Sequence, residues 1–124
     1  LSLARVESYQ DILMPYGIDL KMALEYNAGN ADEFFMRAGL FEQYADSTIE
    51  ALKTIRSQEK YNIQVHSIKS IARGVGAYLL AQLAETDEIR NNMEYSDEIR
   101  DVMINEYMRV RSGLAVFMKE VEKL

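Results

Sequence analysis

His66 is the only histidine among the 124 residues, and its side chain offers the clearest chemistry in the sequence. A neutral imidazole nitrogen is a good nucleophile near pH 7, because an exposed histidine with the ordinary pKa of about 6.5 is mostly uncharged there. Lys69 follows one helical turn later and Arg73 two turns later, so in a helix both cations share the side of His66. The three residues predict an imidazole that can carry an anionic group beside two positive charges.

His66 falls within a long amphipathic pattern without proline, which predicts one helix over residues 58–90. The apolar residues of this pattern recur at spacings of three and four, at Tyr61, Val65, Ile68, Ala72, Val75, Leu79 and Leu83. At about 100° per residue, His66 lies about 100° past Val65 and outside the apolar stripe. We therefore expect the imidazole to be exposed near the middle of its helix.

The residue types present exclude most other reactive sites. The sequence has no cysteine, which excludes disulfides and thiolate metal sites. A single histidine supplies neither a hydrolase triad nor the histidine-rich metal sites of helical bundles. The segment Gly74-Val75-Gly76 falls inside the predicted helix, so we do not interpret it as a phosphate-binding loop. Two glycines inside a helix are unfavourable, and they indicate either close helix packing or a surface that something large approaches.

Composition predicts an all-α domain and limits its partners. Hydrophobic residues make up 48% of the chain and charged residues 27%, with one proline and six glycines, which favours packed helices. The formal net charge is −6 and there is no basic block, so nucleic acid is not an expected partner. No apolar run approaches the roughly 20 residues that span a bilayer, so we expect no membrane insertion of this segment. The absence of cysteine fits a reducing compartment, and we expect a cytoplasmic location.

The first thirty residues contain a turn and one well-marked helix. Residues 1–16 are predicted to form a connector or short helix from an upstream region, ending near the turn signal Pro15-Tyr16-Gly17. Asp19 is a suitable N-cap for a short helix over residues 20–26. Gly29 is a suitable left-handed residue to end it. These signals place the start of a folded domain at about residue 17.

Two further long helices flank the helix of His66. Asn30 can cap a helix over residues 31–56, with Glu33 three residues on as in a capping box. Residues 91–95 are predicted to break the chain, and Ser96 can cap a last helix that continues to residue 124. Short connections make successive helices antiparallel neighbours.

The predicted fold is therefore an all-α, up-and-down antiparallel four-helix bundle with an additional short N-terminal helix. The bundle domain is expected to occupy residues 17–124. Residues 1–16 are expected to lie outside it as the connector.

The combination of these residues resembles the histidine-containing phosphotransfer (HPt) domain of two-component phosphorelays. The resemblance depends on the group His66, Lys69, Gly76, Ala77 and Leu80. It extends upstream to Gly17-Ile18-Asp19, to the segment 29–34 and to Phe41, and downstream to Leu83-Ala84 and Glu88. Two positions depart from the usual pattern, since Ser70 stands where many members have glycine and Ala38 where a larger apolar residue is usual. Neither departure removes a reactive group.

The resemblance implies a phosphorelay intermediate. His66 would accept a phosphoryl group from a receiver-domain aspartyl phosphate and pass it to another receiver, with Lys69 offsetting the charge of the phosphate. Arg73, Ser70 and Gly76 are candidate phosphate-supporting or docking residues. The chain would be a carrier and not an autonomous enzyme, without a cofactor of its own, because the partner receiver domain supplies the aspartate and Mg²⁺. The expected partners are response-regulator receiver domains and a histidine kinase, including a hybrid kinase fused in the same polypeptide.

A second hypothesis belongs to a different functional class. The chain is then a helical interaction or dimerisation module that is never phosphorylated, and His66 is an ordinary solvated side chain. The presence of both His66 and Lys69 favours the phosphotransfer hypothesis over this alternative.

Overall fold

The computed structural model describes residues 2–89 and 97–123, and every regular element in these ranges is a helix. The elements are α1 (Leu3–Glu7), α2 (Gln10–Leu13), the 3-10 helix η1 (Met14–Tyr16), α3 (Leu20–Tyr26), α4 (Ala31–Thr54), α5 (Gln58–Gly74), α6 (Tyr78–Ile89) and α7 (Asp97–Glu122). The predicted all-α class is confirmed. None of the described helices is both long enough and apolar enough to span a bilayer.

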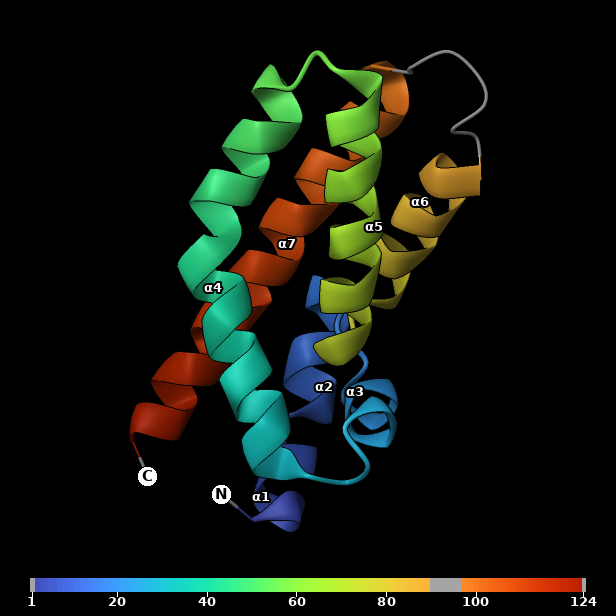
Figure 1. Ribbon diagram of the computed structural model, residues 1–124. Helices are drawn as coiled ribbons and strands as arrows, with labels where there is room; N and C mark the ends of the chain where they lie inside the picture. Colours follow the sequence, from blue (N-terminus) through green and yellow to red (C-terminus); the bar gives the residue numbers. More distant parts are fainter. Residues whose placement is uncertain (1, 90–96, 124) are drawn as a thin grey trace.

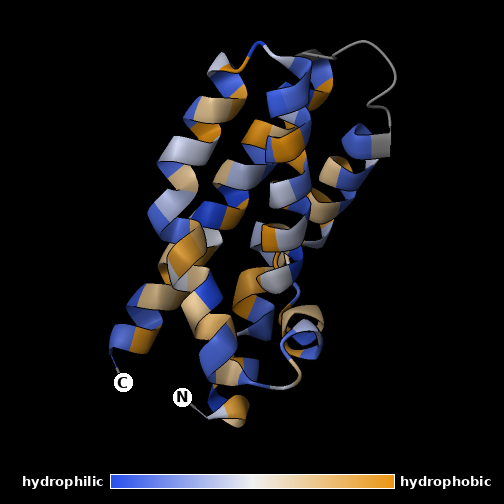
Figure 2. Ribbon diagram, viewed as in Figure 1, coloured by the Kyte–Doolittle hydropathy of each residue, from blue (hydrophilic) through white to orange (hydrophobic). Residues whose placement is uncertain are grey.

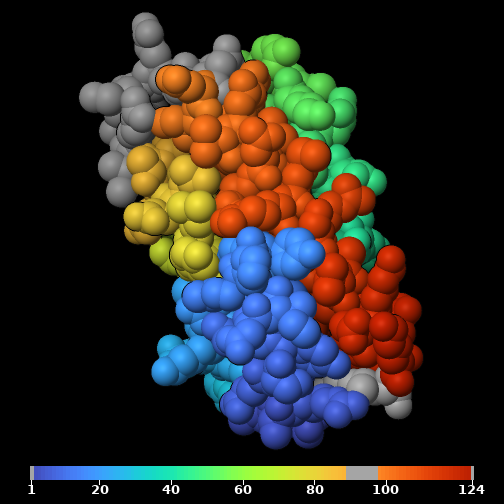
Figure 3. Space-filling model, turned by 180° about the vertical axis from the view of Figure 1, so that it is seen from behind, coloured from blue at the N-terminus to red at the C-terminus, as the bar shows by residue number. Residues whose placement is uncertain are grey.

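The four longest helices lie side by side and reverse direction from one to the next (Figure 1). Helix α4 packs against α5 and α7, and α6 also packs against α5 and α7. The short helices α1 to α3 lie at one end of this group (Figure 1), where Figure 3 shows the first residues of the chain beside α7. Helix α5, which carries His66, thus has α4 on one side and α6 on the other.

Side-chain caps begin the helices that the sequence marks most clearly. Asp19 Oδ1 accepts a hydrogen bond from the Met22 amide, and Asn30 Oδ1 accepts one from the Glu33 amide. Each cap satisfies one of the amides that have no partner within the first turn of a helix. Gly29 has a φ of 75°, as expected for the left-handed residue before α4. The predicted starts of α3 and α4 are confirmed.

The core contains regularly spaced residues of α4 and α7. The buried stripe residues of α4 are Phe34, Ala38, Phe41, Ala45, Thr48 and Leu52, and those of α7 are Met103, Tyr107, Val110, Leu114 and Phe117. The long helices carry apolar and polar residues along their whole length (Figure 2), as amphipathic packing requires. Phe41 stacks on Tyr107 with ring centroids 4.4 Å apart, which joins α4 to α7.

The prediction of one helix over residues 58–90 is wrong, because the chain reverses at Gly76. Helix α5 ends at Gly74 and α6 begins at Tyr78. The Ala77 amide donates to the Ala72 carbonyl at 2.9 Å, and the Gly76 amide donates to the Arg73 carbonyl at 3.2 Å. These two bonds, with a φ of 75° at Gly76, make a Schellman motif that ends the helix. Gly74-Val75-Gly76 is therefore a helix end, and not the helix interior that we expected.

The backbone of α3 explains why glycine is needed at this reversal. The Asp19 amide donates to the Gly76 carbonyl at 2.8 Å. A Cβ on residue 76 would lie 2.2 Å from the Asp19 carbonyl oxygen. The apolar pattern also shifts here, since Leu80 and Ala84 are buried while Leu79 is exposed. In the sequence, apolar residues spaced three and four apart continue from α5 into α6. This continuous spacing hides the break between the two helices.

The N-terminal segment, predicted as a connector or short helix, folds as α1, α2 and η1. Val6 and Leu13 are fully buried in the same core as the longer helices. The Tyr9 ring meets the Phe117 ring edge to face, with centroids 5.5 Å apart. The predicted break over residues 91–95 and the predicted Ser96 cap lie outside the described residues. Helix α7 ends at Glu122, two residues before the predicted end.

Candidate functional site

Helix α5 presents His66 to solvent near its middle. The side chain of His66 is 68% exposed, whereas its neighbours Val65 and Ile68 are fully buried. This contrast is the consequence of the helical period, which turns the imidazole about 100° away from Val65. The predicted exposure of His66, off the core stripe, is confirmed.

A carboxylate from the next helix holds one nitrogen of the imidazole. The Glu88 Oε1 atom lies 2.6 Å from His66 Nδ1, which is hydrogen-bond distance. The other oxygen, Oε2, lies 2.6 Å from Lys69 Nζ. One carboxylate from α6 therefore contacts the two α5 residues that the sequence singles out. Among the described residues, none hydrogen-bonds to the second imidazole nitrogen, Nε2.

The charge state of Glu88 indicates which imidazole nitrogen carries the proton. Hydrogen bonds from Lys69 and, second, from His66 lower the pKa of the Glu88 carboxyl below its ordinary value, against a smaller opposing effect of burial. The carboxyl is therefore ionised at neutral pH and can only accept hydrogen bonds. In the contact with Glu88, Nδ1 must be the donor. The neutral imidazole then has its lone pair on Nε2.

The other candidate residues lie at different places around this cluster. Arg73 Nη2 lies 3.7 Å from Glu85 Oε2, so it extends the line of ion pairs between α5 and α6. Ser70 is exposed on α5, one turn after His66. Gly76 is buried at the reversal, with the Asp19 backbone against it. The structure thus brings together His66, Lys69 and Glu88, while Gly76 belongs to the turn and not to the imidazole surface.

Sequence reasoning placed Glu88 near the end of the helix of His66 and gave it no part in the site. The omission follows from the single-helix prediction, because one straight helix would separate residues 66 and 88 by about 33 Å at 1.5 Å per residue. A reversal at Gly76 instead pairs residues that are about equally far from it on either side. The glycine pair at residues 74 and 76 was the available signal for this reversal.

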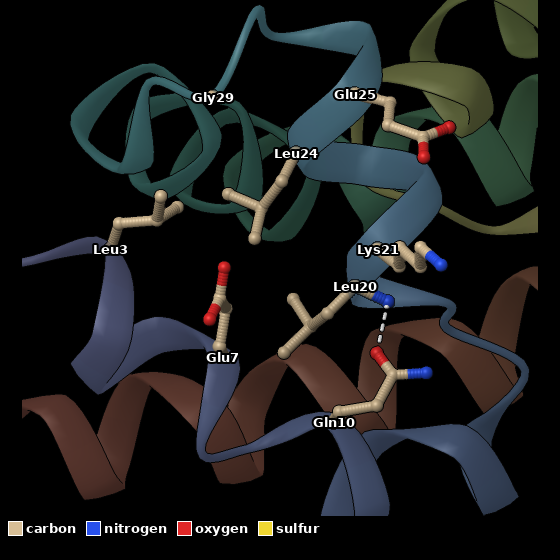
Figure 4. A pocket seen from close by; sticks show the side chains of 8 residues that line it. All are labelled: Leu3, Glu7, Gln10, Leu20, Lys21, Leu24, Glu25 and Gly29. Carbon is tan, nitrogen blue, oxygen red and sulfur yellow. Dashed lines mark hydrogen bonds between the residues drawn. The ribbon is translucent and has the colours of Figure 1, made fainter.

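Metal sites and pockets are the other kinds of site to consider among the described residues. No group of three or more histidine, aspartate or glutamate side chains within them is placed to hold a metal ion. A surface pocket of about 530 Å³ lies between the N-terminal helices and α3, with Leu20 and Leu24 on its wall and Gln10 Oε1 accepting from the Leu20 amide (Figure 4). None of its lining residues comes from α5 or α6, so it is separate from the His66 cluster.

No protein-family model, curated protein or solved structure matches this chain.

Proposed function

We propose that this chain is a phosphorelay intermediate in which His66 Nε2 carries the phosphoryl group. The observation that carries the proposal is the contact of Nδ1 with Glu88 in an imidazole that is 68% exposed. The contact fixes the ring and its tautomer, and it leaves the nucleophilic nitrogen directed away from the carboxylate. The resemblance of the sequence to HPt domains supports the same role.

The transfer step requires only the imidazole of this chain and an aspartyl phosphate on a partner. The Nε2 lone pair attacks phosphorus and forms an N–P bond, while the bond from phosphorus to the aspartate oxygen breaks and its electron pair leaves with the carboxylate. The positive charge that develops on the ring is offset by Glu88, which retains its hydrogen bond from Nδ1–H. In the onward step the aspartate of the next receiver attacks phosphorus, and the N–P electron pair returns to Nε2.

Cations and small side chains near His66 suit a phosphorylated partner. Lys69 lies within the cluster, and Arg73 lies one turn beyond it, so both can offset the negative charge of a phosphate. Ser70 leaves room for the close approach of about 3–3.5 Å that transfer between two proteins requires. Ile63, one turn before His66, is an exposed apolar residue that a protein partner can cover.

The partners in this proposal are response-regulator receiver domains and a histidine kinase, which can be a hybrid kinase fused to this chain. The receiver supplies the aspartate and Mg²⁺, and this chain acts as a carrier in the cytoplasm without a cofactor of its own. We assign α4 to α7 as an up-and-down antiparallel four-helix bundle, with the short N-terminal helices packed into the same core. The alternating directions of α4 to α7 and the packing of each of them on two neighbours support this assignment (Figure 1).

A labelling experiment with a phosphorylated receiver domain tests the proposal. The protein should take up one phosphoryl group through a bond that is labile in acid and stable in base, as a phosphoramidate is. The His66→Gln variant should take up none, and its melting temperature should stay close to that of the wild type, because an exposed substitution usually changes stability by less than about 0.5 kcal/mol.

Two outcomes would contradict the proposal. Undiminished labelling of His66→Gln would show that another residue is phosphorylated. No labelling of the wild type by a panel of active receiver domains would favour the alternative, in which the chain is an unphosphorylated interaction module.

A further inference from the structure

The carboxylate that holds His66 lies in a part of α6 that is intrinsically weak. Asp87 and Glu88 both fall in the last turn of α6, which has no basic residue. The last carbonyls of a helix have no intrahelical partners, and negative charges are unfavourable at that end of the helix dipole. Helix ends with few stabilising contacts open more readily than helix interiors. The position of Glu88 therefore depends on contacts outside its own helix.

Tyr61 supplies such a contact from α5. Its hydroxyl donates to Asp87 Oδ2 at 2.6 Å. Tyr61 is 2% exposed and Asp87 is 7% exposed, so both polar groups are inside the protein, where an unpaired group is costly. The bond joins α5 to α6 in the interior, at the residue next to Glu88 in the sequence.

The sequence positions of the four residues connect this buried bond to the imidazole. Tyr61 and His66 belong to α5, and Asp87 and Glu88 are consecutive in α6. Fixing Asp87 against Tyr61 therefore fixes the backbone of its neighbour Glu88 relative to α5. We propose that Tyr61 and Asp87 are positioning residues, whose buried hydrogen bond holds the last turn of α6 on α5 and so keeps Glu88 on His66 Nδ1. The consequence for phosphotransfer rests on the function proposed above, but the positioning itself does not.

The Tyr61→Phe variant tests this inference, with Tyr107→Phe as the matched control. Tyr107 is also a buried tyrosine, on α7, and it packs on Phe41 of α4, away from α6. Both variants lose one buried hydroxyl and keep the ring. Only Tyr61→Phe should release Glu88, which NMR detects as an upward shift of the Glu88 carboxyl pKa. The ¹⁵N signals of the single histidine should also move towards a mixture of tautomers at about pH 9, where an ordinary histidine is neutral.

Phosphotransfer provides a second readout. Transfer to His66 should slow by about tenfold in Tyr61→Phe, the change in population that the loss of one good hydrogen bond produces. Transfer should be unchanged in Tyr107→Phe. If the wild type is never phosphorylated, the NMR readouts still decide whether Tyr61 positions Glu88, so the two proposals can fail separately.

Two Asp87 variants separate positioning from general stability. Asp87→Asn keeps an oxygen that can accept from Tyr61, so it should retain the His66 signals of the wild type, whereas Asp87→Ala should reproduce those of Tyr61→Phe. The inference is overturned if Tyr61→Phe leaves the Glu88 pKa and the imidazole signals unchanged. It is also overturned if Tyr107→Phe shifts them equally, because the effect would then be global.

Discussion

At the scale of residues, the site consists of one carboxylate between two nitrogen groups. Glu88 contacts His66 through one oxygen and Lys69 through the other. It can therefore fix the imidazole while Lys69 helps to keep the carboxyl ionised. The sequence predicts that His66 and Lys69 lie together, because they are one helical turn apart on the same helix. The place of Glu88 could not be predicted, since it depends on a change in chain direction ten residues after His66.

The titration of Glu88 tests this arrangement. Because the hydrogen bond from Lys69 is the largest cause of its lowered pKa, Lys69→Ala should move the Glu88 carboxyl pKa upward towards 4.5, its ordinary value. A carboxyl whose pKa is lowered by folding stabilises the folded state at pH values above its ordinary pKa. This contribution is lost as the pH falls through the lowered pKa. The cluster should therefore be intact at neutral pH and should open only in acid.

Carboxyl ¹³C NMR measures this titration directly. Lys60→Ala is the matched control, because Lys60 is an exposed lysine on the same helix, and it should leave the Glu88 pKa unchanged. An unchanged Glu88 pKa in Lys69→Ala would show that the ion pair does not persist in solution.

At the scale of elements, local signals predicted where helices begin better than where they end. Asp19 and Asn30 were correctly predicted as caps because capping is a property of a few consecutive residues. The end of α5 was missed because apolar spacing alone does not distinguish one helix from two that meet at a tight turn. The Gly76 carbonyl also accepts from the Asp19 amide, and this contact with a residue far away in the sequence cannot be predicted from the local residues.

Substitutions of two glycines, one before α4 and one between α5 and α6, separate backbone strain from steric conflict. Gly29 and Gly76 both have a φ of 75°, but a Cβ at Gly29 meets no atom within 4 Å, whereas one at Gly76 meets the Asp19 carbonyl oxygen at 2.2 Å. Gly29→Ala should cost about 1 kcal/mol from strain alone. Gly76→Ala should cost at least about 3 kcal/mol, because the backbone of α3 must move as well. Urea unfolding compares the two, and equal losses would mean that α3 is not packed against the reversal.

At the scale of the whole molecule, the N-terminal helices share the core of the longer ones. Residues 1–16 are predicted to be a connector because the turn signal Pro15-Tyr16-Gly17 separates them from the helices that follow. The structure nevertheless buries Val6, Tyr9 and Leu13 against the long helices. Burial in a shared core depends on which distant surfaces meet, and that information is not contained in a short segment.

Two leucines in this segment test its contribution to stability. Leu13 is fully buried, and Leu3 is 42% exposed. Leu13→Ala should lower the free energy of unfolding by about 2–4 kcal/mol through lost burial and the cavity that remains. Leu3→Ala should change it by less than about 0.5 kcal/mol. If both variants unfold at the wild-type urea concentration, the segment is not part of the cooperative fold.

The atom that carries phosphorus is the most direct test of the proposed function. Because the chain has a single histidine, ¹⁵N-histidine labelling gives one pair of imidazole nitrogen signals. After incubation with a phosphorylated receiver domain, coupling between ³¹P and ¹⁵N should appear at Nε2, while Nδ1 keeps its proton and its contact with Glu88. Coupling at Nδ1, or a phosphorylated protein without coupling to either nitrogen, would contradict the proposal that His66 Nε2 is the phosphoryl carrier.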